Sequence, residues 1–354
     1  MTRPSTRDSA RVLSPSLPDS NAAWSTAWPV LGLSLAWGSR RGDLPSQAEL
    51  DAWAREHTQG LIDRFPLDIR EATMLLLATA LATKVTWQMP FEVVPASRLG
   101  RPDHWAVEHV LEAPAGHLQF IASTEEAGDV AVHAAIGKAQ HPYGLRVTSV
   151  IAAADVPADR VLAAAHRLAT RPRQARVRSL FDLATGEHPL WTITEQPVQT
   201  TSPNGQEERF VTVLPAWSAR SEHDLDHAHL GMPAAAHALA QLLGLGEYQY
   251  EAKQSAAATY SRTGFEAAAV TGLDVALSAA LRSQSGLRRT AELRYVHPYA
   301  VVATAEHWVN REDAAWRGIP VFYAWVAEAD ESEADESEAD LSDLRDVSDR
   351  PGQR

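Results

Sequence analysis

Residues 264–271 read Gly-Phe-Glu-Ala-Ala-Ala-Val-Thr and form the most informative stretch of the chain. One glycine, one acid and a run of very small side chains make an unusual composition for a core element. In an extended strand, alternate side chains share one face, which here groups Phe265, Ala267, Ala269 and Thr271. Three of these four side chains are small. The inward face of such a strand could approach its neighbours closely everywhere except at Phe265.

Three further stretches accompany it. Residues 50–93 run from a helical pattern that ends in Thr-Gln-Gly, through an apolar run, to a signature made of Lys84, Trp87, Pro90 and Phe91. Residues 215–225 read PAWSARSEHDL. Near the end, His297, Pro298 and Tyr299 lead into the apolar run 300–304, and 320–326 is the last expected strand.

These stretches, in this order, resemble the serpin family over about residues 50–326. The resemblance implies an α+β fold with large mixed or antiparallel β-sheets, packed helices and an exposed reactive loop. In that family a protease cuts the loop, which then threads into a large sheet as a new strand. The resemblance implies a loop hinge that consists of Gly264, Phe265, Glu266, Ala267, Ala268, Ala269, Val270 and Thr271, and it places Trp87 where the loop enters the sheet.

The loop itself is expected to run from Gly264 to about Thr290. Counting forward from Gly264 places the cut near Ser278-Ala279, and counting back from Pro298 places it near Leu287-Arg288, so the scissile bond stays open. The arginines in this region would suit a protease with an acidic specificity pocket, because guanidinium pairs bidentately with carboxylate; they are Arg282, Arg288 and Arg289. The alternative for this region is an alanine-rich surface helix, since residues 275–281 are good helix formers.

Two departures from the family bear on activity. Residues 1–45 are too few to supply the helices and strands that precede the matched helix in a serpin, so the chain is either truncated or a reduced fold. Phe265 stands where inhibitory members carry a small residue, and inserting a phenylalanine could overpack a formed sheet. If Phe265 lies on an exposed loop, Phe265→Thr should leave the stability of the uncut chain nearly unchanged.

The composition limits the classes of protein and of site that the chain can form. The chain has 354 residues, of which 45% are hydrophobic and 22% charged, and no cysteine, so neither a disulfide framework nor a thiolate site is available. Its formal charge of -13 is concentrated in residues 328–354, which hold eleven acidic residues and three arginines. We expect a flexible leader over 1–20, an N-terminally reduced serpin-like domain over 21–327 and an acidic disordered tail over 328–354.

The acidic tail either solubilises the chain or serves as an acidic arm for a basic partner. No signal peptide is seen, which favours the cytoplasm over the extracellular alternative.

Local patterns predict several elements. Ser46 and Glu49 form a capping box for a helix that stops near Gly60. Residues 157–168 and 233–243 read as helices with proline in the first turn, and 129–136 and 210–215 read as strands. Residues 196–206 read as a loop. Residues 74–82 could be a helix by pattern, and the resemblance favours a central strand.

Function follows from the resemblance rather than from catalytic motifs. A suicide inhibitor of serine proteases is the leading hypothesis, with a serine protease as partner, no cofactor, no catalytic residue of its own, and a monomeric state without nucleic-acid or membrane binding. A non-inhibitory serpin-like binding protein that is cleaved as a substrate is the alternative. His223 and His227 could share a helix face as zinc ligands of a metal-dependent enzyme, but the stretch favours a polar turn and no metal. No hydrolase or phosphate-binding motif occurs in the sequence.

Overall fold

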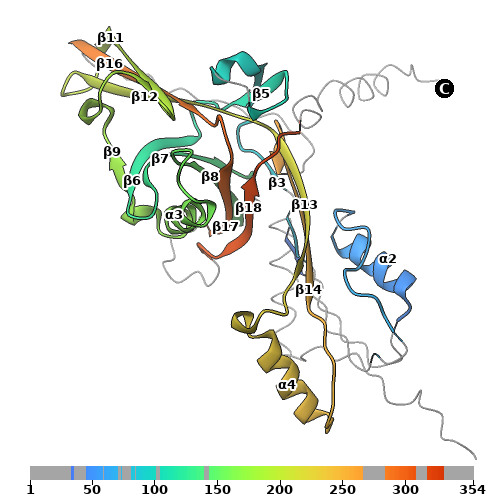
Figure 1. The fold of residues 1–354 in the computed structure, drawn as a ribbon. Coiled ribbons are helices and arrows are strands. Elements are labelled where there is room, and N and C mark those ends of the chain that lie inside the picture. Colours follow the sequence, from blue (N-terminus) through green and yellow to red (C-terminus); the bar gives the residue numbers. More distant parts are fainter. Residues whose placement is uncertain are drawn as a thin grey trace, which may run out of the picture. The chain divides into compact units, whose positions relative to one another are not determined.

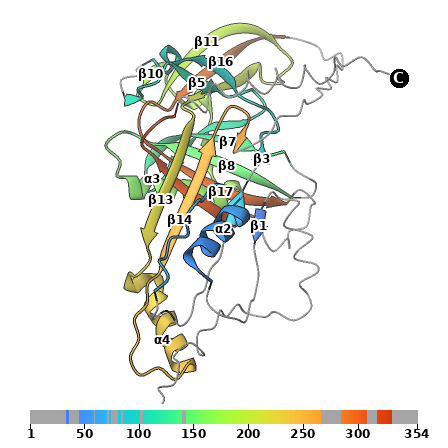
Figure 2. The ribbon, with the colours of Figure 1, turned by 90° about the vertical axis from the view of Figure 1, so that its right-hand side faces the viewer.

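The computed structural model describes residues 33–35, 45–58, 60–70, 73, 81–83, 85–100, 104–138, 143–265, 284–307 and 317–330. Within these ranges the protein is an α+β, strand-rich chain, which confirms the predicted class (Figures 1 and 2). It divides into two compact units, one of Met1–Thr83 with Ala219–Ala258 and one of Lys84–Ser218 with Thr259–Arg354. No helix in the described ranges is long and apolar enough to cross a membrane.

One six-stranded sheet is antiparallel throughout and carries a buried hydrophobic core. Its spatial order is β18 (Pro320–Val326), β17 (Tyr299–His307), β8 (Tyr143–Ile151), β7 (Gly128–Ile136), β6 (Leu118–Thr124) and β9 (Arg176–Arg178). The helix α3 (Ala158–Thr170) packs on one face of this sheet, as both ribbon views show. Alternate strand positions such as Val130, Val132 and Val150 meet the apolar stripe of α3 in one buried cluster. The predicted helix at 157–168 and the strands at 129–136 and 320–326 are confirmed.

The second six-stranded sheet is mixed. Its order is β10 (Gly186–His188), β11 (Trp191–Thr200), β16 (Gln284–Arg294), β12 (Gln206–Leu214), β5 (His109–Glu112) and β4 (Glu92–Pro95), and β12 runs parallel to β16. Short 3-10 helices described in the same unit include η2 (Ala96–Leu99) and η5 (Leu180–Asp182), which connect strands, and η4 (Pro172–Gln174), which connects α3 to β9.

The loop predicted at 196–206 is confirmed only for residues 201–205 and is too long at both ends. Residues up to Thr200 belong to β11 and Gln206 already begins β12, so only the tight turn between them is irregular. Pro197 misleads because proline is rare inside sheets. Among the described strands, β10 pairs with Trp191–Ile193 and no strand lies beyond β11 at Pro197, so a missing N–H is tolerated there.

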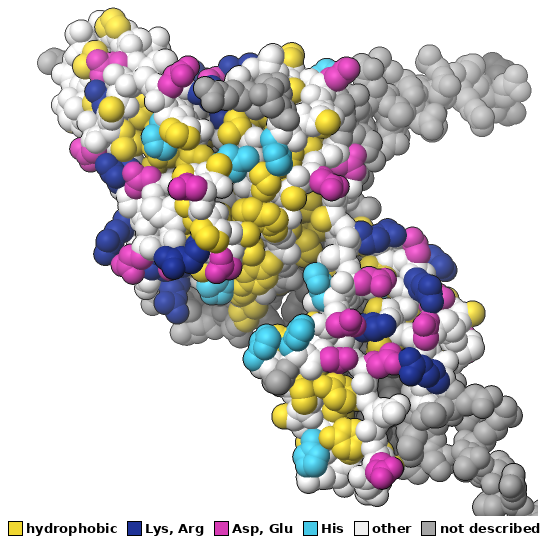
Figure 3. Space-filling view, in the orientation of Figure 1, with side chains coloured by type: hydrophobic (Ala, Val, Ile, Leu, Met, Phe, Trp, Pro, Cys, Tyr) yellow, Lys and Arg dark blue, Asp and Glu magenta, His cyan; other side chains and the backbone are white. Residues whose placement is uncertain are grey.

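The other unit contains α2 (Gln47–His57) and α4 (Met232–Leu242), the 3-10 helix η6 (Ala228–Leu230), and the pair of β1 (Leu33–Leu35) with β2 (Leu81–Thr83). The predicted capping box is confirmed, because Ser46 and Glu49 exchange hydrogen bonds at the start of α2. Gly60 follows the helix with a φ of 84°, which favours glycine. Figure 3 shows acidic and basic side chains interspersed over the face around α2. The ion pairs of this unit include Arg55–Asp63 and Arg64–Asp68.

The strands β13 (Trp217–Asp224) and β14 (Lys253–Tyr260) pair with each other and connect through η6 and α4. The predicted helix at 233–243 is confirmed, with proline in its first turn. The residues 74–80 of the expected central strand lie outside the described ranges, and Leu81 begins β2. After β14 the chain turns at 261–263 into β15 (Gly264–Phe265), which pairs antiparallel with β3 (Val85–Thr86).

Gly286, near the start of β16, lies in close contact with the adjacent turn. A Cβ at Gly286 would lie 2.5 Å from Thr200 Cγ2 and closer still to Gly205 O, so the adjacent turn leaves no room for a side chain. We expect Gly286→Ala to lower the free energy of unfolding by about 1–3 kcal/mol, the usual cost of overpacking. Urea denaturation measures this loss. Gly246→Ala is the matched control, because a Cβ at Gly246 meets nothing within 4 Å; equal effects of the two changes would contradict the close contact.

Candidate functional site

The site is built on the segment that carries the Trp-x-x-Pro-Phe signature. Trp87 forms an isolated β-bridge with Gly137, and the amide of Gln88 donates to Ile136 O over 2.8 Å, which ties the segment to the end of β7. Gly137 permits this approach, since a Cβ there would lie 2.9 Å from the Cβ of Val85. The segment is therefore fixed to the end of β7, independently of its contacts with residues 261–265.

Three successive carbonyls of the turn at 261–263 accept hydrogen bonds from this segment. The Trp87 indole Nε1–H donates to Ser261 O (3.0 Å), the Phe91 amide to Arg262 O (3.0 Å) and the Trp87 amide to Thr263 O (2.9 Å). The turn is closed by the Ser261 amide, which donates to Gly264 O over 2.9 Å. We call residues 87–91 and 261–265 the hinge site.

Phe265 ends the hinge site as a buried residue. Its side chain is 2% exposed, and its ring lies 5.8 Å from Phe322, 6.3 Å from Trp217 and 6.5 Å from Trp87 between centroids. The expectation that Phe265 lies on an exposed loop is therefore wrong. An apolar ring of this size stabilises a protein most when aromatic neighbours surround it, and this cluster provides them.

The remaining predicted loop residues divide into two groups. Leu287, Arg288 and Arg289 lie in β16, where the backbone pairs with β11 on one side and β12 on the other. Arg288 forms an ion pair with Glu207 and Arg289 with Glu195, whereas the side chain of Leu287 is exposed. The prediction that these three residues lie on a loop is therefore wrong, because they belong to a paired strand. The structure does not describe Lys84 of the signature, nor the hinge and scissile candidates Glu266, Ala267, Ala268, Ala269, Val270, Thr271, Ser278, Ala279 and Arg282.

A buried histidine pair that contacts Met89 and Phe91 of the hinge site was not predicted from the sequence. His117 Nδ1 lies 3.0 Å from His133 Nε2, and His117 Nε2 lies 2.8 Å from the carbonyl oxygen of Met89. Burial lowers the pKa of His117 to about 4 and holds the pKa of His133 well below its ordinary value. The available signal was a histidine within the otherwise apolar run 130–136 of β7.

The predicted metal candidates do not share a helix face. His223 lies in β13, whereas His227 precedes η6 and its ring stacks on His229 at 5.7 Å. Within the described ranges, no three His, Asp or Glu side chains come together in a way that could hold a metal ion.

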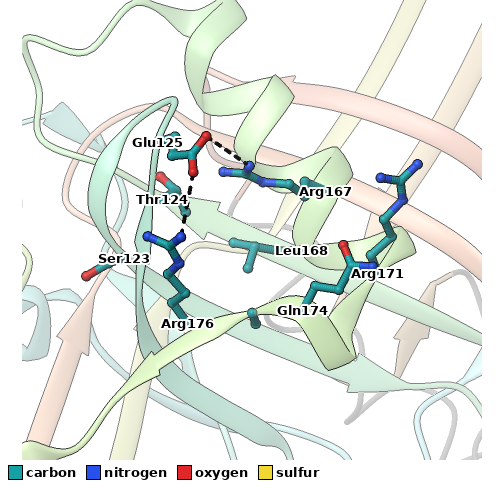
Figure 4. A pocket seen from close by; sticks show the side chains of 9 residues that line it. Ser123, Thr124, Glu125, Arg167, Leu168, Arg171, Gln174 and Arg176 are labelled. Carbon is teal, nitrogen blue, oxygen red and sulfur yellow. Dashed lines mark ion pairs between the residues drawn. The ribbon is translucent and has the colours of Figure 1, made fainter.

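A cavity of about 140 Å³ lies between the end of α3, η4 and the turn after β6. Arg167 and Arg176 turn their guanidinium groups toward Glu125, whose carboxylate lies 3.8 Å from each of them (Figure 4). An acidic side chain of the chain itself thus already sits between the two cations in this cavity.

Neither a protein-family model nor a curated protein sequence matches the chain. Among solved structures, a thyroxine-binding globulin complex with thyroxine aligns with a TM-score of 0.44 and 13% sequence identity. The alignment covers 79% of this chain and 63% of that one, so the chain spans less than two thirds of that structure's length. A likeness at this level assigns neither fold family nor ligand.

The packing of Phe265 gives a direct prediction. Phe265→Ala should lower the free energy of unfolding by about 3–5 kcal/mol, because the lost ring leaves a cavity among the aromatic side chains. Phe265→Leu keeps most of the apolar volume and should cost less than about 1.5 kcal/mol. Urea unfolding of both variants measures the difference. A wild-type free energy for Phe265→Ala would show that the ring is not part of the folded core.

Proposed function

We propose that the chain inhibits serine-type endopeptidases as a suicide substrate, in the way its resemblance to serpins implies. The observation that supports this most is the attachment of residues 266–283 at both ends. On one side the chain leaves a buried Phe265 and a turn with three bound carbonyls; on the other it enters β16, which is paired along both edges. Both flanks of this segment are thus fixed, as an inhibitor that is cut between two anchors requires.

The same attachment narrows the scissile region. A protease must take the substrate backbone into its own active site, and the amides and carbonyls of residues 287–289 are committed to neighbouring strands. The guanidinium groups of Arg288 and Arg289 are likewise committed to glutamates. We therefore propose that the cut falls at Ser278-Ala279 or beside Arg282. Arg282 would direct the inhibitor to a protease with an acidic specificity pocket.

The burial of Phe265 also removes the overpacking that was expected when the loop inserts into a sheet. The Phe265 ring is already packed in the uncut chain, and the backbone of Phe265 already pairs with Val85, so the ring imposes no new overpacking when the loop moves. Insertion would start at Glu266, and the next inward residues, Ala267 and Ala269, are small. After the protease serine forms its acyl-enzyme with the loop, insertion would drag the protease before water completes hydrolysis.

The non-inhibitory alternative rests on one specific observation. The hinge turn is held by three backbone acceptors and an aromatic cluster, and a hinge held this firmly could insert too slowly to trap a protease. The chain would then be cut as an ordinary substrate, and its function would be to bind another molecule.

Paired substitutions in the hinge test the proposal. Incubation with trypsin-like and chymotrypsin-like proteases should give a covalent complex that survives boiling in detergent. Ala267→Arg places a charge on the inward face and should abolish the complex while cleavage continues, because a buried unpaired charge opposes insertion. Ala268→Arg, on the opposite face of the same strand, is the matched control and should still form complex.

Gel electrophoresis with mass analysis of the released peptide reads out both outcomes. Clean cleavage by every protease, without complex, would rule out the inhibitor and leave the binding protein. A cut within residues 287–289 would contradict the assignment of the scissile region.

A further inference from the structure

The histidine pair under the hinge site forms a chain of hydrogen bonds with a definite direction. The Met89 carbonyl can only accept, so His117 Nε2 carries the hydrogen that donates to it over 2.8 Å. In a neutral ring, His117 Nδ1 is then an acceptor, and the hydrogen between the two rings belongs to His133 Nε2, 3.0 Å away. The nitrogen of the pair that carries no hydrogen and accepts no described hydrogen bond is therefore His133 Nδ1.

His133 Nδ1 is buried and has no hydrogen-bond partner among the described residues. It belongs to a row across three strands, in which Gln119 of β6 and Ser149 of β8 are the register partners of His133 in β7. Gln119 Oε1 and Ser149 Oγ are also buried without a described partner. The row therefore holds an unused proton acceptor in a polar but water-excluded place.

The titratable side chains next to the pair are Tyr295, whose hydroxyl donates to Ser149 O over 2.8 Å, and Tyr260, which packs on Phe91. The charged group nearest in the contacts of the described ranges is Arg262, whose Nε donates to Phe91 O over 3.4 Å. Burial raises the pKa of both tyrosines well above the ordinary value, so they stay neutral. A proton taken up by the histidines would meet no compensating carboxylate.

The histidine pair also contacts the segment 87–91, which holds the turn at 261–263. Met89 lies between Trp87 and Phe91, which supply all three hydrogen bonds to the turn carbonyls at 261–263. Phe91 additionally packs edge-on against His117, with centroids 4.8 Å apart. The neutral pair thus holds the donor side of the hinge site in place.

We propose that His117 and His133 are positioning residues that form a proton-operated latch on the hinge: the neutral pair keeps the hinge site closed, and uptake of a proton favours its opening. A single proton enters at His133 Nδ1 and is shared along the chain, so the pair titrates as a unit. The cost lies in a buried positive charge without a counter-ion, which an open, hydrated hinge site relieves. The consequence of opening for loop insertion rests on the proposed inhibitory function.

The sign of the effect follows from linkage. The folded pKa values lie below the unfolded value near 6.5, so closure is fully favoured above pH 6.5 and weakens as the pH falls toward about 4. For one shared proton, opening becomes up to about tenfold more favourable per pH unit in this window.

Hydrogen exchange without any protease tests the latch. In the intact protein, the protection of the Trp87 and Phe91 amides, corrected for intrinsic exchange, should fall by up to about tenfold per unit between pH 6.5 and 4.5. The double variant His117→Gln/His133→Gln keeps amide donors in place of the two Nε2–H groups and should lose this pH dependence. His166→Gln, on the exposed side of α3, is the control and should keep the wild-type profile.

An unchanged profile in the double variant would overturn the latch. If the double variant does not fold, nitrogen NMR of the wild-type imidazoles decides instead: both rings should be Nε2–H tautomers at pH 7.5, and an Nδ1–H tautomer at His117 would overturn the hydrogen-bond chain. A pH-dependent hinge in a protein that traps no protease would leave the latch standing and remove the inhibitory function.

Discussion

The turn at 261–263 depends on a single constraint, which is that its three consecutive carbonyls need donors in a place with little water. Trp87 and Phe91 provide all three, two from the backbone and one from the indole ring. An unpaired buried carbonyl costs free energy comparable to a lost hydrogen bond, so the turn can hold its position only while residues 87–91 hold theirs. Those residues are in turn tied to the end of β7. The antiparallel sheet thereby determines where the chain departs at Phe265.

The other end of the segment 266–283 is fixed by a different kind of interaction. The strand β16 has neighbours on both sides, parallel on one and antiparallel on the other, and the close approach at Gly286 fixes its start. One anchor is thus a compact turn on an aromatic cluster, and the other is an extended strand in a sheet. Among the described residues, the downstream side of a cut would stay paired in β16, while the upstream side is restrained through Phe265 and the turn.

Helices and isolated strands could be predicted from the sequence because their signals are local. The capping box at Ser46 and Glu49 and the first-turn proline of α4 act within a few residues, and both are confirmed. The long-range features were missed. Phe265 reads as a barrier on a loop because its aromatic partners, Trp217 and Phe322, are distant in sequence. Residues 284–290 read as loop because their strand partners lie about 80 to 100 positions upstream. The histidine pair depends on a carbonyl, Met89 O, that no side-chain pattern can reveal.

The central claim is that a cut between Phe265 and Gln284 lets the upstream arm join a sheet. The melting temperature of the chain after a single cut in this segment tests it most directly. An added strand should raise the melting temperature, by about 2–4 °C for each kcal/mol gained. We expect a clear rise over the uncut chain kept with inactivated protease. A melting temperature that stays the same or falls after cutting would contradict the claim.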